Sequence, residues 1–141
     1  GEVAEYEAAR LMGLELADVR QVGYDATRTS GGRRERIQIK GRCLLPGRGR
    51  NPRISRINVE GEWDTLMVVV LDGALEPVAI FEAERPDVIA KLSEPGSKAR
   101  NERHTLALSQ VRSISTCAWS AGGGEHPVPP GTRARSEPTA T

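Results

Sequence analysis

Residues 66–71 are continuously apolar, with three valines in succession. Such a run is typical of a strand that is buried on both faces, because a strand with one solvated face would alternate apolar and polar residues. A strand of this kind lies at the centre of a sheet that has further layers on each side. We therefore predict an α/β (α+β) fold in which residues 66–71 form the central strand.

The residues before this run predict a β-hairpin. Residues 19–29 are β-like, and Ser30-Gly31-Gly32 then gives a hairpin turn signal. Residues 36–44 follow as the second strand, in which isoleucines alternate with polar residues. Residues 46–56 are dense in Gly, Pro and Arg without periodicity, so we expect a long basic loop there.

Two helices are predicted on either side of the strands. Residues 3–14 place apolar residues near helical spacing, which indicates an amphipathic helix that ends near Gly13. Residues 78–83 are expected to form a fourth strand. Residues 86–92 predict a short helix, because a proline and an aspartate occupy its first turn.

The C-terminal third predicts two further elements and a tail. Residues 106–108 indicate a short strand, and Ser109 is the expected N-cap of a last helix that runs to residue 118. The predicted order of elements is α-β-β-β-β-α-β-α. Residues 121–141 contain too few apolar residues to fold, so we expect one domain over residues 1–120 and a disordered tail.

Composition narrows the class of protein. The chain has 141 residues, of which 38% are hydrophobic, and this is enough for one core. No run of about 18 apolar residues is present, so we expect no membrane partner. No charged and then apolar leader is visible, which makes a cytoplasmic location the default. Cys43 and Cys117 lack the spacing of a zinc site and are expected to be buried, reduced thiols.

The net charge of +1 conceals a strong asymmetry along the chain. Residues 28–56 contain ten basic residues and one acid, whereas the rest contains ten basic residues and eighteen acids. An arginine-rich block suits a polyanion, because phosphates accept the planar guanidinium group. A solvated arginine loop is the alternative. The predicted nucleic-acid contacts are Arg42, Arg48, Arg50, Arg53, Arg56, Lys98, Arg100 and Arg103.

The strongest functional signal lies on the predicted hairpin. Asp25 precedes Gln38 by thirteen residues, and the two strands bring these positions together. Side chains alternate along a strand, so Gln38 and Lys40 point to one face while Ile39 points into the core. Asp25 can join the face of Gln38 and Lys40, which would place an acid, an amide oxygen and an ammonium side by side.

Phosphodiester hydrolysis needs such a set. It uses oxygen ligands for Mg²⁺ and a cation that stabilises the attacking hydroxide or the developing phosphorane charge. Lys40 is the candidate cation, and Asp25 is the candidate anionic ligand. Gln38 would add a neutral ligand, and the carbonyl of Ile39 a further oxygen. Glu5, on the first helix, would hold a metal-bound water or a second ion.

These residues resemble the signature of the PD-(D/E)XK nuclease superfamily, which includes restriction endonucleases and archaeal Holliday-junction resolvases. The match rests on Gly23-Tyr24-Asp25 and on Ile37-Gln38-Ile39-Lys40-Gly41, with a Glu-bearing helix in front, and it spans roughly residues 1–118. It is similar in detail to small bacterial domains of that superfamily with no assigned function.

The resemblance implies a restriction-endonuclease-like core with a mixed central β-sheet flanked by helices. It also implies dependence on Mg²⁺ or Mn²⁺, and DNA as the partner and substrate. The chain would act as a metal-dependent endonuclease, alone or within a defence or repair system. Nucleases that cut both strands of a duplex often pair two subunits, and the sequence leaves a homodimer or larger complex open. The implied catalytic residues are Glu5, Asp25, Gln38 and Lys40, and the implied metal ligands are Glu5, Asp25, Gln38 and Ile39.

Each residue also has a simpler interpretation. Gln38 stands where most members of the superfamily carry Asp or Glu, and a neutral amide binds a divalent cation more weakly. Asp25 could instead pair with a nearby arginine. Lys40 could protect a strand edge against aggregation. The helix acid is Glu5 or Glu2, with Glu5 preferred because two alanines follow it on the helix.

Two rival functions follow from these alternatives. The first is a non-catalytic module that binds nucleic acid with the same fold and has lost its metal through Gln38. The second is a protein-interaction domain whose basic loop meets an acidic partner. Trp63 is expected in the core, with base stacking as a weaker option, and His104 in a polar loop is expected to be inert.

Overall fold

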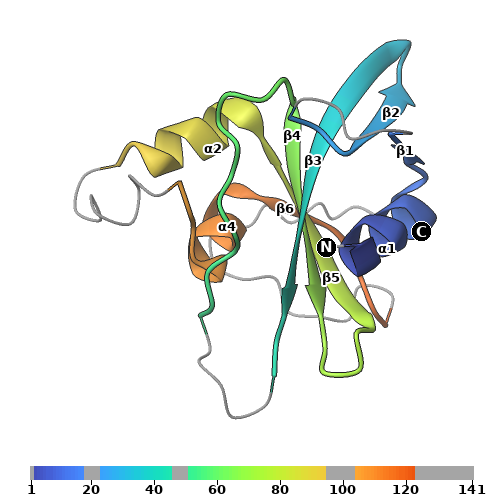
Figure 1. Ribbon diagram of the computed structural model, residues 1–141, viewed down its shortest axis with the longest axis vertical. Coiled ribbons are helices and arrows are strands. Elements are labelled where there is room, and N and C mark those ends of the chain that lie inside the picture. Colours follow the sequence, from blue (N-terminus) through green and yellow to red (C-terminus); the bar gives the residue numbers. More distant parts are fainter. Residues whose placement is uncertain (1, 18–22, 46–50, 95–103, 123–141) are drawn as a thin grey trace.

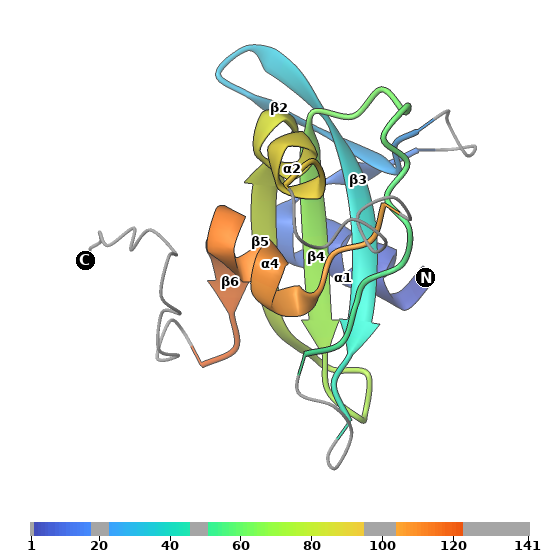
Figure 2. The same cartoon turned by 90° about the vertical axis from the view of Figure 1, so that its left-hand side faces the viewer.

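The computed structural model describes residues 2–17, 23–45, 51–94 and 104–122 as a mixed six-stranded sheet with helices on both faces (Figure 1). The strands lie in the order β1-β2-β3-β4-β5-β6, and β3 and β4 are parallel whereas the other neighbours are antiparallel. In the two views α1 covers one face, and α2 and α4 cover the other (Figures 1 and 2). The elements are α1 (Glu2–Met12), β1 (Glu15–Leu16), β2 (Ala26–Ser30), β3 (Arg33–Cys43), β4 (Thr65–Leu71), β5 (Pro77–Glu84), α2 (Arg85–Leu92), α4 (Leu108–Ile114) and β6 (Thr116–Ser120).

The central position of the apolar strand is confirmed. All seven residues of β4 are buried, and β4 lies between β3 and β5. Leu66, Val68 and Val70 belong to the core under α2 and α4, whereas Met67, Val69 and Leu71 belong to the core under α1. A strand with apolar residues at every position is required because each of its faces meets a separate hydrophobic core.

The predicted hairpin is also confirmed, with shifted bounds. β2 begins at Ala26, and β3 begins at Arg33, three residues earlier than expected. Gly31 and Gly32 form a two-residue turn with φ of 61° and 78°. Positive φ at both positions matches the twist of the flanking strands, and only glycine adopts it without strain. Residues 19–22 of the expected first strand lie outside the described residues.

The C-terminal part of the prediction is wrong. The expected strand at residues 106–108 is a single bridge between Arg53 and Ala107, and α4 starts after Ala107 and ends at Ile114. In place of a helix to residue 118, the strand β6 follows and pairs with β5. Pairing along the open edge of β5 therefore outweighs the local helical pattern. Over the described residues the order is α-β-β-β-β-β-α-α-β, which differs from the predicted order by the additional strand β1 and by the C-terminal elements.

A close contact holds α1 against the sheet. Ala4 and Ala8 are the buried residues of α1, and a Cβ atom at Gly41 would lie 2.6 Å from the Cβ of Ala4. Only a residue without a side chain allows the helix to approach β3 this closely. Gly41 thus fixes the first helical turn of α1 beside the stretch of β3 that carries Lys40.

Cys43 and Cys117 are free thiols, but both are half-buried rather than buried. Trp63 is buried in the core under α2 and α4, as predicted. Within the described residues, no helix has the length and apolar character needed to span a membrane. The proposed tail falls almost wholly on residues 123–141, which lie outside the described part of the chain.

Candidate functional site

Asp25 stands where β2 begins to pair with β3. Its main-chain N–H donates to the carbonyl of Ile37 at 2.8 Å, and its carboxylate Oδ2 accepts the N–H of Ile39 at 2.8 Å. The carboxylate thus takes the place that a main-chain carbonyl would occupy in the next rung of the ladder. Among the described residues, no ion pair joins Asp25 to an arginine, which was the simpler interpretation of this acid.

Lys40 is half-buried on the face of β3 that lies under α2 and α4. Its register partner is Val68, whose side chain belongs to that core. Burial lowers the pKa of the Lys40 ammonium, and the charge of Asp25 opposes this shift. The two groups are therefore close enough to interact electrostatically. β3 lies between β2 and β4, but β2 pairs with it only as far as Ile37, so among the described residues Lys40 has a strand partner on the β4 side alone.

Gln38 has a structural role in this arrangement. Its side chain is only 4% exposed. The amide oxygen accepts the N–H of Asn58 at 3.2 Å, and the amide nitrogen donates to the carbonyl of Gly23 at 3.4 Å. Gln38 thus joins the segment that enters β2 to the segment that precedes β4. Asn58 and Gly23 complete the surroundings of Gln38, and no sequence pattern singled out Asn58.

Arg85 organises the same region from the first position of α2. Its guanidinium donates to the carbonyls of Val59 at 2.6 Å, Gly61 at 2.7 Å and Trp63 at 2.9 Å, and it lies 4.7 Å from the centre of the Trp63 ring. A cation at a helix N-terminus opposes the helix dipole, so these contacts must outweigh that cost. The segment that holds Gln38 through Asn58 is therefore anchored to α2.

Glu5 lies on α1, one residue after the contact of Ala4 with Gly41. It is half-buried and interacts with another group, whereas Glu2 is exposed. α1 covers the face of Ile37 and Ile39, which is opposite to the face of Lys40. Among the described residues β2 pairs with β3 only as far as Ile37, so β2 leaves the edge of β3 beyond Ile37 uncovered.

The predicted nucleic-acid contacts divide into three groups. Arg42 and Arg56 are exposed. Arg53 is half-buried and donates from Nε to the Thr105 hydroxyl at 3.0 Å and from a terminal nitrogen to the Thr105 carbonyl at 2.8 Å, so it ties two segments together. Five others lie outside the described residues: Arg48, Arg50, Lys98, Arg100 and Arg103.

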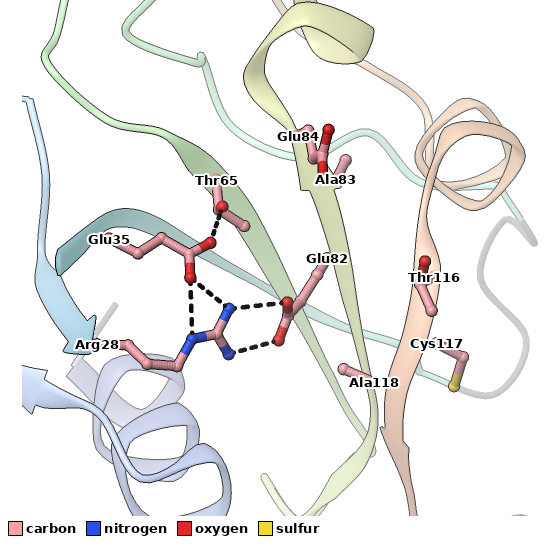
Figure 3. Close-up of a pocket in the computed structure, with 9 residues that line it drawn as sticks. All are labelled: Arg28, Glu35, Thr65, Glu82, Ala83, Glu84, Thr116, Cys117 and Ala118. Atoms are coloured by element: carbon pink, nitrogen blue, oxygen red, sulfur yellow. Dashed lines mark hydrogen bonds and ion pairs between the residues drawn. The ribbon is translucent and has the colours of Figure 1, made fainter. Parts of the chain in front are cut away.

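An open hollow of about 580 Å³ lies elsewhere, on the α1 face of the sheet (Figure 3). Arg28 lies within it between two acids and donates to Glu35 at 3.0 and 3.1 Å and to Glu82 at 3.0 and 3.1 Å. The Thr65 hydroxyl donates to the second oxygen of Glu35. These two acids raise the pKa of Arg28. Each of these four side chains already has a partner in the cluster. The cluster therefore has a structural role and connects β2, β3 and β5.

The donor set at Asp25 fits a hard divalent cation in part. Asp25 supplies one carboxylate, and the Ile39 carbonyl points to the same strand edge as the Ile39 N–H, toward Asp25. Glu5 carries a second carboxylate on α1. The oxygen of Gln38 is committed to Asn58. Among the described residues, no group of three or more His, Cys, Asp or Glu side chains is arranged to hold a metal.

Comparison of the sequence with models of known protein families finds no match, and no curated protein matches it. The structure defines the chain as an α+β protein with a mixed six-stranded sheet. Its candidate site is the cluster of Asp25, Gln38 and Lys40 on adjoining strands, with Glu5 on the neighbouring helix.

Proposed function

We propose that the chain is a metal-dependent nuclease that hydrolyses DNA phosphodiester bonds at Asp25 and Lys40. The observation that carries the proposal is the placement of a carboxylate and a half-buried ammonium close together where β2 and β3 separate. The resemblance of this stretch to the PD-(D/E)XK signature supports the same chemistry.

In this proposal Lys40 neutralises charge on the phosphate. A half-buried ammonium interacts with a phosphate oxygen more strongly than one in water, because the local dielectric constant is lower. Burial lowers the pKa of the Lys40 ammonium, and the charge of Asp25 opposes this shift and so favours the charged form. The hydrogen bond from Ile39 N–H fixes one oxygen of Asp25, so the direction of the carboxylate is set before substrate binds.

Asp25, Glu5 and the Ile39 carbonyl would hold a Mg²⁺ or Mn²⁺ ion. Such an ion, when bound, would supply Lewis-acid polarisation of the phosphodiester and a water of lowered pKa. Gln38 would position the site and would not bind the ion, since its amide holds the segment of Gly23, before Asp25, and the segment of Asn58.

The test uses substitutions that preserve the local contacts. In Asp25→Asn, an amide oxygen can still accept the Ile39 N–H while the charge is removed. In Lys40→Met, the apolar stem is kept without the ammonium. We expect each variant to lose cleavage of a supercoiled plasmid with Mg²⁺ or Mn²⁺ by about 100-fold or more, as for other groups that stabilise transition-state charge.

The matched controls are Asp87→Asn and Lys91→Met on α2, which change the same charges away from the site. Both controls should cleave at the wild-type rate. Full cleavage by Asp25→Asn and Lys40→Met, with retained folding by circular dichroism, would remove these residues from the mechanism.

A second candidate function is a module of the same fold that binds DNA without cleaving it. The observation in its favour is that Gln38 is 4% exposed and uses both ends of its amide on the main chain. This candidate predicts salt-dependent DNA binding that needs no divalent cation and no cleavage by the wild-type chain.

A further inference from the structure

The tip of the β2–β3 hairpin extends beyond the other strands as a two-stranded ribbon (Figures 1 and 2). β1 pairs with β2 only at Ala26 and Thr27, and β4 pairs with β3 only from Ile37 onward. Among the described residues, those numbered 28–35 therefore pair only with each other. The ribbon ends in the glycine turn, with Ser30 opposite Arg33 and Thr29 opposite Arg34.

The base of this ribbon is clamped on both faces. On the α1 face, Arg28 joins the ribbon to Glu82 of β5 (Figure 3). On the opposite face, the main-chain N–H and the Nε of Arg36 donate to Asp64 at 2.8 and 3.2 Å. These contacts neutralise the arginines at the base and hold the ribbon at a fixed angle to the sheet.

The tip, in contrast, carries two arginines that are available to a partner. Arg33 and Arg34 are exposed, and neither has an acid within ion-pair distance among the described residues. Arg33 helps to lower the pKa of Asp64 only through its more distant charge. Because they are consecutive on a strand, the two side chains leave the ribbon on opposite faces.

We propose that residues 29–34, the hairpin arm, enter the major groove of duplex DNA and contact the phosphates on both of its walls. The B-DNA major groove is about 12 Å wide and admits a two-stranded ribbon, whereas the major groove of duplex RNA is too narrow. Arg33 would meet the phosphates of one wall, and Arg34 those of the other. The assignment of DNA as the partner rests on the proposed function.

The length of the arm relates it to the candidate site. Ser30 is five residues from Asp25 along the strand, which corresponds to about 17 Å at the rise of an extended chain. One turn of B-DNA is about 34 Å, so the arm reaches phosphates about half a turn from the bond at the site. A substrate with the arm engaged must therefore extend about five base pairs beyond that bond on one side.

The test measures how DNA binding depends on salt. The full chain, with Arg33→Ala and Arg34→Ala combined, is titrated in EDTA with a duplex of about 20 base pairs at several salt concentrations. Two lost phosphate contacts should reduce the slope of log K against log salt by about 1.8. If the affinities converge at about 1 M salt, binding at about 0.1 M should fall by about 60-fold. Arg33→Lys with Arg34→Lys should restore the slope.

The matched control removes two positive charges elsewhere. Arg10→Ala with Lys91→Ala deletes exposed or half-buried cations from α1 and α2, each paired with an acid on its own helix or just after it. Its slope should stay at the wild-type value. An equal fall of the slope in both double variants would refute the proposed role of the arm, because the effect would then depend on net charge alone. An equal fall for duplex RNA would overturn the assignment to the major groove of DNA.

Plasmid cleavage separates this proposal from the proposed function. If the wild-type chain binds DNA but never cleaves it, and the arm variant shows the predicted loss of DNA binding, the proposed role of the arm is supported and the nuclease function is refuted. If Asp25→Asn abolishes cleavage while the arm variant keeps the wild-type slope of log K against log salt, the nuclease function is supported and the role of the arm is refuted. A wild-type chain that binds no DNA at all would overturn both.

Discussion

Replacing Arg85 by alanine tests whether one side chain anchors the segment that holds the candidate site. The substitution removes three hydrogen bonds from a charged donor, to the carbonyls of Val59, Gly61 and Trp63, and the contact with the Trp63 ring. Gln38 is held by Asn58 in the same segment. The loss should therefore appear both in stability and in the behaviour of Gln38.

The magnitude follows from those contacts. A hydrogen bond to a charged group contributes about 1.5 to 3 kcal/mol, and a cation over an aromatic ring about 0.5 to 2 kcal/mol. Water replaces part of this loss, because Val59 and Arg85 are only half-buried. We therefore expect the free energy of unfolding to fall by about 3 to 5 kcal/mol, a large share of the stability of a small domain.

Urea denaturation followed by tryptophan fluorescence measures this loss. At a slope of about 2 kcal/mol per molar, the midpoint should fall by about 2 M urea. Arg85→Lys should give an intermediate loss, since an ammonium cannot reach all three carbonyls and does not stack on the ring. Lys91→Ala on the same helix is the control, and its midpoint should change little.

The sign of the change decides the interpretation. If Arg85 acted only through its charge at the start of α2, alanine would stabilise the protein by about 0.3 to 1 kcal/mol, because a cation there opposes the helix dipole. A stabilised Arg85→Ala variant would therefore refute the anchoring role. A double-mutant cycle with Gln38→Ala should give a coupling free energy above about 0.5 kcal/mol, and additivity would show that Arg85 does not act on Gln38.

Three further predictions concern the site and its supports. Gly41→Ala should destabilise the protein by about 1 to 3 kcal/mol through overpacking against Ala4, and Ala4→Gly in the same chain should recover part of this loss in thermal unfolding. The pKa of Lys40, followed by NMR, should lie below 10.5 and should fall further in Asp25→Asn. Between the pKa of Lys40 in the folded chain and 10.5, the unfolded chain binds more protons than the folded chain. The free energy of unfolding should therefore increase as the pH rises through that window. Gln38→Glu should destabilise at neutral pH, since a carboxylate faces the Gly23 carbonyl, and a concurrent gain of metal-dependent cleavage would identify a degenerate site.

The central strand and the hairpin could be predicted because their signals are local. An apolar residue at every position of residues 66–71 has no stable placement except between two layers, and paired glycines at the hairpin turn specify a two-residue loop. The strand β6 could not be predicted in this way. Its residues become a strand because they pair with β5, and that edge exists only once the sheet has formed.

The candidate site shows the same division. Alternation along β3 predicts that Gln38 and Lys40 share a face. The sequence does not reveal that Asn58 and Gly23 occupy both ends of the Gln38 amide, or that Arg85 anchors the segment from a helix distant in the chain. These contacts join residues 15 to 26 positions apart, and no periodic pattern encodes them.

The sequence by itself determined which stretch is apolar at every position, where glycines allow a turn, and where a basic block lies. Only the tertiary structure decided which arginines of that block are free to meet a partner. Arg28 and Arg36 are neutralised by acids from β5 and from the segment before β4, whereas Arg33 and Arg34 project past every acid that the sheet brings to the hairpin base. The physical reason is that the charge of a side chain is set by its type, but its availability depends on which opposite charges the fold places within reach.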